Sequence, residues 1–209
     1  GDSGLPYLLP GINVLVGLEG EKRESLEVNY RFLKGILDEG LLLRRINIRQ
    51  VMPVRREFPQ TVSHSEFLHF KDKIRQEIDR PLLERLVPVG TVLRSVYTEM
   101  REGKVTFGRQ IGTYPLLVGI PYPVELERFY DVAVVSHGFR SISAVEYPLK
   151  VNECRITALE ALPGLGRKRA IRLFRARPLK DRDGLRKALD DPKVADSVLP
   201  FLSFERPEH

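Results

Sequence analysis

The chain has 209 residues and a mass of 23.9 kDa, with a formal net charge of +6 and a sequence pI near 9.5. Hydrophobic residues make up 42% of it, which suffices for packed cores and excludes wholesale disorder. The single cysteine, Cys154, excludes an internal disulfide, a four-cysteine zinc site and a cluster held by three cysteines of this chain. No stretch has the apolar length of a membrane helix, so we expect a cytoplasmic protein with no membrane partner.

Residues 1–87 alternate between strand and helix patterns. Apolar runs predict strands at 11–18 and 41–52, and apolar residues spaced three and four apart predict helices over about 21–39 and 65–86. This order implies parallel strands in a partial α/β segment. Two strands are too few for an independent sheet. We therefore expect an exposed sheet edge that pairs with another subunit or with a missing part of a longer protein.

Residues 88–150 have a different sequence pattern, in which short β-like runs are separated by glycine and proline. Five short strands in this length predict a small OB-like β-barrel. The predicted strands are 91–97, 104–110, 115–119, 129–136 and 142–147.

Residues 151–209 have a helical pattern. We expect Thr157 and Asp183 to cap two of the helices and Pro192 to begin the last one. The predicted fold is therefore α+β with three modules: an α/β segment at 1–87, a barrel at 88–150 and a helical domain at 151–209.

The positive charge is concentrated in this last module. Residues 155–187 contain 11 basic and three acidic side chains, a local charge of +8. Such a segment is a candidate for binding a polyanion. The alternative is a solvated helix face with no ligand.

The loop from Leu162 to Gly166, followed by three basic residues, resembles the helix-hairpin-helix motif of nucleic-acid-binding proteins. Two glycines permit a tight reversal, and backbone amides at a helix N-terminus favour an anion. Contacts of this kind reach the backbone of a nucleic acid, so binding should be independent of sequence and sensitive to salt. The alternative is a structural hairpin that binds nothing or binds protein. The candidate phosphate-binding residues are Gly164, Leu165, Gly166, Arg167, Lys168, Arg169 and Arg172.

The run Gly17-Leu18-Glu19-Gly20-Glu21 resembles a strand-end motif of radical S-adenosylmethionine enzymes of the methylthiotransferase type. Residues 9–13 and 43–53 are similar to late barrel strands of an archaeal family of such enzymes that ends in a helix-hairpin-helix. The resemblance implies that residues 1–87 are the remnant of a barrel. It also implies that S-adenosylmethionine and an iron–sulfur cluster belong to a longer parent protein. The cofactor-binding residues it implies are Gly17, Gly20, Glu21 and Arg49.

Residues 88–150 resemble a TRAM-type barrel, the small RNA-binding module attached to tRNA methylthiotransferases. The residues that carry this resemblance are Val89–Leu93, Thr106–Arg109, Tyr114–Val118 and Asp131–Val135. It implies an RNA-binding surface that includes Arg109, Tyr114 and Arg140. The alternative is a spacer barrel that only orients its neighbours.

The sequence thus predicts the nucleic-acid-binding C-terminal portion of a longer protein, with RNA or DNA as the partner. Neither a catalytic residue nor a metal ligand set is predicted, and we expect no catalysis by this chain alone. A scaffold that binds protein is one alternative. The other is an S-adenosylmethionine-binding enzyme of RNA modification that is complete only in the longer protein.

Overall fold

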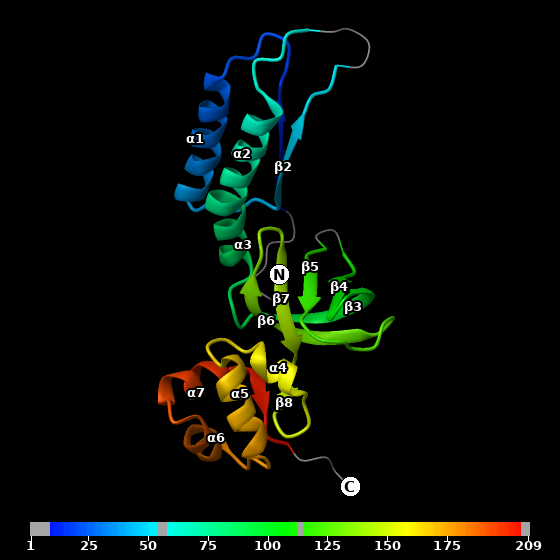
Figure 1. Cartoon of the computed structure of the whole chain (residues 1–209), viewed down its shortest axis with the longest axis vertical. Helices are drawn as coiled ribbons and strands as arrows, with labels where there is room; N and C mark the ends of the chain where they lie inside the picture. Colours follow the sequence, from blue (N-terminus) through cyan, green and yellow to red (C-terminus); the bar gives the residue numbers. More distant parts are fainter. Residues whose placement is uncertain (1–8, 54–57, 113–114, 206–209) are drawn as a thin grey trace. The chain divides into compact units, whose positions relative to one another are not determined.

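The computed structural model describes residues 9–53, 58–112 and 115–205. The chain divides into two compact units, Gly1–Val87 and Pro88–His209 (Figure 1), and each is described by itself. Helices and strands together make it an α+β protein, as the sequence predicts. No helix in the described ranges combines the length and the apolar character needed to span a bilayer.

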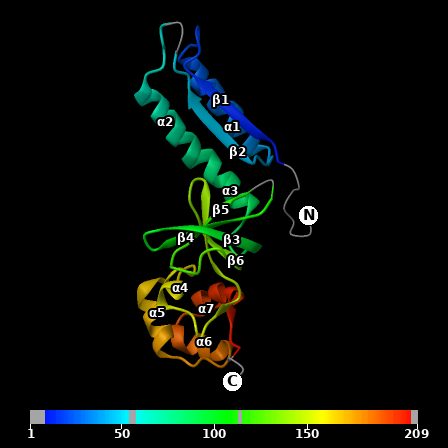
Figure 2. The ribbon, with the colours of Figure 1, turned by 90° about the vertical axis from the view of Figure 1, so that its right-hand side faces the viewer.

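The N-terminal unit is built on two parallel strands that are joined by a helix, with a long helical segment after the second strand (Figure 2). The predicted alternation of strand and helix is confirmed, although both strands are shorter than the apolar runs that indicated them. The elements are β1 (Gly11–Val16), α1 (Glu24–Asp38), β2 (Arg45–Gln50), α2 (His64–Ile74), a π-helical stretch (Arg75–Asp79) and α3 (Arg80–Leu86).

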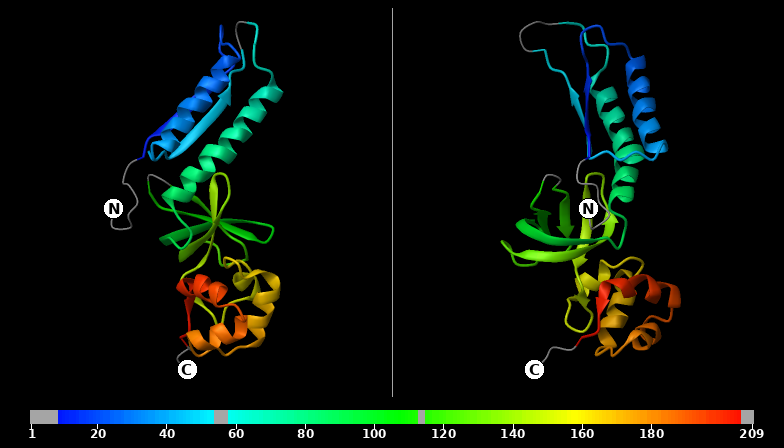
Figure 3. Two further views of the ribbon diagram at one scale, coloured as in Figure 1. Left: turned by 90° about the vertical axis from the view of Figure 1, so that its left-hand side faces the viewer. Right: turned by 180° about the vertical axis from the view of Figure 1, so that it is seen from behind.

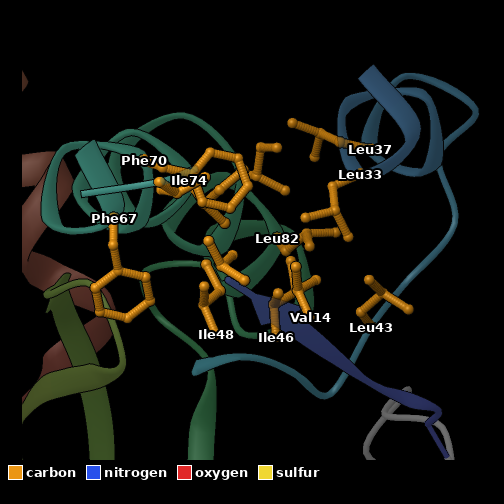
Figure 4. Packing of buried hydrophobic residues seen from close by; sticks show 13 residues of the cluster. Val14, Leu33, Leu37, Leu43, Ile46, Ile48, Phe67, Phe70, Ile74 and Leu82 are labelled. Carbon is orange, nitrogen blue, oxygen red and sulfur yellow. The ribbon is translucent and has the colours of Figure 1, made fainter. Parts of the chain in front are cut away.

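The helices cover one face of the strand pair, and the apolar core lies between them (Figure 4). Side chains alternate across a strand, so Val14 on β1 and Ile46 and Ile48 on β2 point to the same face. From α1, Leu33 and Leu37 complete the packing. The other buried members of this core are Val16, Leu43, Val62, Phe67, Phe70, Ile74, Ile78 and Leu82.

Within the described residues of this unit, no helix covers the opposite face of the strand pair (Figure 3). It carries Asn13 and Leu15 from β1 and Asn47 and Arg49 from β2. The side-chain amide of Asn47 donates to the Asn13 oxygen at 3.0 Å, which ties the two strands together on this side. Parallel sheets are normally buried on both faces, so this sheet has the character of a part of a larger one.

The helix predicted at 65–86 is present as a continuous helical segment, but the π-helical stretch interrupts its regular turns. Ser63 begins α2 with a capping box, in which the Glu66 carboxylate accepts the Ser63 amide at 2.8 Å. The wider π turn changes the phase of the helix that follows. Leu83 is therefore buried, whereas Leu86, which continues the four-residue apolar spacing, is only partly buried.

The C-terminal unit begins with a closed five-stranded barrel, which confirms the five short strands. The strand order is β3-β4-β5-β7-β6, with β5 parallel to β7 and the other pairs antiparallel. The strands are β3 (Val92–Glu102), β4 (Val105–Gln110), β5 (Leu117–Ile120), β6 (Phe129–His137) and β7 (Ser141–Glu146).

A bulge in β3 is held by a carboxylate from β6. Ser95 has a left-handed φ of 54°, and the β3–β6 register shifts between Leu93 and Val96. The Asp131 carboxylate accepts the Ser95 amide at 2.9 Å and also bonds Arg94. These bonds lower the pKa of Asp131, because they favour the charged carboxylate.

Four helices complete this unit, and two short strands close it where the helices begin and end. Strand β8 (Leu149–Lys150) pairs in parallel with β9 (Leu202–Ser203). The helices are α4 (Ile156–Glu160), α5 (Gly166–Arg175), α6 (Arg182–Leu189) and α7 (Pro192–Val198).

Two of the expected helix caps are wrong. Thr157 lies inside α4, which has no side-chain cap, and Asp183 lies in the first turn of α6. Asp181 caps α6, since its carboxylate accepts the Gly184 amide at 2.9 Å, the third amide of the helix. Pro192 does begin α7, after the cap Asp191.

Leu33 and Phe32 are adjacent on α1 and give a matched test of this core, since Leu33 is 0% exposed and Phe32 is 60% exposed. Leu33→Ala should lower the free energy of unfolding of the N-terminal unit by about 3 kcal/mol, because it leaves a cavity. Phe32→Ala should change it by less than about 0.5 kcal/mol. Hydrogen exchange of the β1 and β2 amides measures both, and equal effects would contradict this packing.

Candidate nucleic-acid interface

The predicted hairpin joins α4 to α5 and is fixed from inside by apolar side chains. Leu162 and Leu165, on either side of the turn, are both buried, and the Leu165 amide donates to the Leu162 carbonyl at 3.2 Å. Ala170 on α5 is fully buried, and its small side chain lets α4 and α5 approach closely. The hairpin backbone is therefore a rigid part of the helical segment.

The two glycines of the hairpin adopt a backbone conformation that other residues rarely take. Gly164 has a φ of +72° and Gly166 a φ of +58°. A Cβ at Gly166 would meet no atom within 4 Å, and one at Gly164 would meet only Val194, at 3.9 Å. The turn is thus open on its outer side, where a ligand could approach the backbone.

This open turn leads directly into an uncapped helix. No side chain caps α5, and its first turn contains no acidic residue. The first amides of an α-helix have no acceptor within the helix. They and the helix dipole give this end a partial positive charge that an anion can neutralise.

The basic residues of the hairpin divide into two groups. The Arg167 side chain is 83% exposed, and its Nε lies 4.0 Å from the Glu160 carboxylate. Lys168 is exposed and forms no ion pair with any described residue. Arg169, in contrast, donates to the Gly164 carbonyl at 2.9 Å and to Asp191 at 3.1 Å.

The turn between α6 and α7 neutralises two of the five basic residues of α5. Arg172 pairs with Asp190 at 2.6 Å, and Asp191 holds Arg169. Between α6 and α7, the Arg186 guanidinium pairs with the Asp196 carboxylate at 2.7 Å. These aspartates follow the basic segment 155–187 in the sequence, so a local charge count omits them. Three of the basic residues of the predicted positive patch are therefore neutralised, whereas Arg167 and Lys168 at the hairpin stay exposed, as does Arg175 at the far end of α5.

The predicted barrel residues lie on its outer surface. Arg109 on β4 pairs with Glu99 at 3.1 Å and lies opposite Tyr97 in the register of β3. The Tyr97 ring lies 5.1 Å from that of Phe129 on β6. Arg140 is exposed in the turn between β6 and β7. Tyr114 lies outside the described residues. The sequence analysis missed the aromatic pair beside Arg109, which the antiparallel register brings together.

The residues expected to bind a cofactor lie in the turn after β1 and near the end of β2, and of these Glu21 and Gly17 are joined by a hydrogen bond. Gly17 has a φ of +87° and Gly20 a φ of +78°, in the turn after β1. The Glu21 carboxylate accepts hydrogen bonds from the backbone amides of Gly17 and Leu18. These two amides of the turn are therefore already bonded within the chain. Arg49 lies on the uncovered face and forms no ion pair with the described residues. Open α/β sheets bind their ligands at the carboxyl ends of the strands.

The fit of these residues to the implied cofactors differs. Gly20 and Arg49 remain accessible to an anionic or polar ligand at the strand ends. An iron–sulfur cluster does not fit this chain, because its single cysteine lies in the other unit. Nor does the described part of the chain bring together three or more side chains that could hold a metal ion.

Cys154 has a structural contact that the sequence did not indicate. Arg177 donates to the Cys154 carbonyl at 2.8 Å and to its sulfur at 3.0 Å. The same guanidinium lies 4.5 Å from the centroid of the Phe174 ring. Burial raises the pKa of the Cys154 thiol, and the nearby Arg177 opposes that shift. The arginine therefore fastens the loop after α5 to the segment before α4.

Comparison with known proteins places this chain beside two archaeal proteins. A protein of Archaeoglobus fulgidus is 44% identical over 171 residues, which cover 78% of this chain and 32% of that protein. Protein MJ0274 of Methanocaldococcus jannaschii is 48% identical over 152 residues, 68% of this chain and 28% of that protein. Both are described only as uncharacterized. The chain therefore spans about a third of the length of the curated relatives it matches. No family model matches the chain.

Two nearby arginines test the structural role of the contact with Cys154. Arg177→Ala should lower the free energy of unfolding of the C-terminal unit by about 2 kcal/mol, because it removes two hydrogen bonds of a partly buried charged donor. Arg175→Ala should change it by less than about 0.5 kcal/mol, because Arg175 is exposed and forms no ion pair with a described residue. Urea denaturation followed by circular dichroism measures both. A loss for Arg175→Ala as large as that for Arg177→Ala would contradict the assignment.

Proposed function

We propose that the C-terminal unit binds the phosphate backbone of a nucleic acid through the hairpin between α4 and α5. The observation that carries this proposal is the open turn at Gly164 and Gly166 on the N-terminus of an uncapped ten-residue helix. Arg167 and Lys168, both exposed, stand beside it. Backbone amides, a helix dipole and two cations converge on one place, which is the chemistry of phosphate binding. Two helices joined by a glycine turn also support the resemblance of the sequence to the helix-hairpin-helix motif.

The barrel supports the same proposal as a second contact. A closed barrel of five strands, in which β5 runs parallel to β7, is consistent with the OB-like and TRAM-type barrels that the sequence resembles. Arg109 and Arg140 lie on its surface, and Tyr97 and Phe129 offer aromatic rings beside Arg109. Cations and rings together suit a single-stranded nucleic acid.

Charge reversal at the hairpin tests the proposal. Arg167→Glu should weaken binding of RNA and of duplex DNA by roughly tenfold and flatten the plot of log affinity against log salt by about one unit, because phosphate contacts are lost. Lys180→Glu is the matched control, since Lys180 is an exposed lysine beyond the far end of α5, a helix whose ten residues span about 15 Å. Fluorescence anisotropy across a salt series measures both variants.

Gly166→Asp gives a second measurement, because it places a carboxylate at the open turn. It should weaken binding at least as much as the arginine variant. Absence of binding by the natural chain at low salt would overturn the proposal, as would an equal loss in the Lys180→Glu control.

The N-terminal unit favours a second role, as part of a larger α/β sheet in a longer protein. Strand β1 pairs with β2 on one edge only within the described residues, and exposed apolar side chains border it. Val28 and Phe32 are exposed four residues apart on α1, and Leu15 is exposed on β1. The relatives are about three times as long as the matched region. We propose that a further strand and helix of such a protein cover this flank. That protein would be the radical S-adenosylmethionine-like parent, with the cofactor near Gly20 and Arg49.

Hydrogen exchange on the full-length Archaeoglobus fulgidus relative tests this second role. Amides of its counterpart to β1 should exchange slowly in the full-length protein and faster in a segment equivalent to this chain, because the additional strand protects them. Equal exchange rates would overturn the proposal. A stable dimer of this chain that Phe32→Glu dissociates would assign the flank to a second copy instead.

A further inference from the structure

A groove in the C-terminal unit lies where the barrel meets the segment that leads into α4. Its volume is about 780 Å³, and strands β3, β6 and β7 supply one wall. Residues of β8 and the turn before α4 supply the other. The groove is lined by Phe129, Tyr147 and Glu146, among others, on the barrel side, and by Lys150, Glu153 and Arg155 on the opposite side.

The Glu146 carboxylate sets this groove apart. It ends β7 in a partly buried position, and its side chain is hydrogen-bonded by Tyr122, which is itself buried. The Glu146 amide also donates to the Tyr122 hydroxyl, at 3.2 Å. This carboxylate is therefore held in one orientation by a group inside the barrel.

Other carboxylates of the groove have partners that Glu146 lacks. Asp131 bonds Arg94 and the Ser95 amide, and Glu153 pairs with Lys150 at 3.6 Å. Among the described residues no cation lies within ion-pair distance of Glu146, and Arg155 acts on it only at longer range. A partly buried carboxylate without a paired cation costs free energy. Groups of this kind are concentrated at functional sites.

Aromatic rings and cations surround this carboxylate. Phe129 is 57% exposed and lines the groove, as do Tyr130 and Tyr147. The Arg94 guanidinium lies 5.9 Å from the centroid of the Tyr147 ring, and Lys150 and Arg155 belong to the same groove. Rings can stack an unpaired base, and the cations can contact its phosphates. The same cations would repel a basic peptide, so a nucleobase is the ligand that fits the whole groove.

The chemistry of the carboxylate selects among the bases. A carboxylate only accepts hydrogen bonds, and its two oxygens can receive two adjacent donors. The Watson–Crick edge of guanine presents an imino and an amino N–H side by side. Uracil presents one N–H between two carbonyl oxygens, which a carboxylate repels. Base edges become accessible in this way only in an unpaired strand.

We propose that this groove binds one unpaired guanine of a single strand, with Glu146 accepting its Watson–Crick donors and an aromatic ring stacking on its face. The inference deepens and rests on the proposed nucleic-acid function, to which it adds base specificity. Helix α4 connects Arg155 in the groove to the hairpin, and its five residues span about 8 Å. One strand could therefore contact the hairpin by its backbone and the groove by a neighbouring base.

A single guanine in a uridine strand tests the groove. The natural chain should bind a labelled twelve-nucleotide RNA with one central guanine about tenfold more tightly than the all-uridine strand, the discrimination of one bidentate base contact. Glu146→Gln should abolish this ratio, because an amide replaces one acceptor oxygen with a donor. Glu153→Gln is the matched control, since it removes the same charge from the same groove and should retain the ratio. Fluorescence anisotropy measures all of these affinities.

The outcomes separate this inference from the proposed function. Equal affinity for both strands, or a ratio that survives Glu146→Gln, overturns the guanine site while the backbone contact stands. If the natural chain binds neither strand, the proposed function fails, and the groove is then tested alone with guanosine and uridine monophosphates by nuclear magnetic resonance. Shifts at Glu146 and Tyr147 with the guanosine nucleotide alone support the groove. Equal shifts with both nucleotides, or none, overturn it.

Two further measurements keep the test decisive. Phe129→Ala removes an exposed ring and should weaken binding of the guanine-containing strand more than binding of the all-uridine strand. This variant replaces Glu146→Gln in the test if that variant does not fold. An arginine-rich peptide that binds the natural chain, but not Glu146→Gln, would reassign the groove to a cationic protein segment.

Discussion

Burial of Leu162 and Leu165 on either side of a reversed backbone is the constraint on which the candidate interface depends. Both leucines can reach the core only if the chain turns sharply between them, and that turn requires the left-handed conformation of Gly164. Gly166 then begins α5 with its backbone facing open space. The polar surface of the hairpin is therefore a consequence of apolar packing beneath it. The open turn is already organised in the free chain, so a ligand of the kind proposed would not have to order it.

The ion pairs of the helical segment decide which charges remain for a partner. Asp190 and Asp191 sit at the end of α6 and neutralise Arg172 and Arg169. Exposed pairs of this kind contribute little to stability, so their main effect is on the electrostatic field of the surface. They lower the positive potential along the middle of α5 and leave the cations beside the open turn, Arg167 and Lys168, exposed.

Much of the fold follows from local sequence patterns, since helix periodicity and turn residues act over a few positions. The five barrel strands and the long helix after β2 were predictable for this reason, as were the two glycines of the hairpin. The pairing of Arg169 with Asp191 was not, because it joins residues 22 positions apart through tertiary packing. The groove around Glu146 could not be predicted either, because a sequence does not show which carboxylates lack a paired cation in the folded structure. The cap of α6 was predicted wrongly because two aspartates lie beside the same helix start, and Asp181, not Asp183, has the required position. The cap of α4 was predicted wrongly because that helix begins at Ile156, which places Thr157 inside it.

The short parallel pairing of β8 with β9 has a consequence for how the two candidate contacts act together. It fastens the end of the four-helix segment to its beginning, at the point where the chain leaves the barrel. The helical segment is thus attached to the strand end at both of its own ends. If one strand contacts both the hairpin and the groove, as proposed, the second contact forms at the effective concentration set by the first, so the two together bind more tightly than either alone.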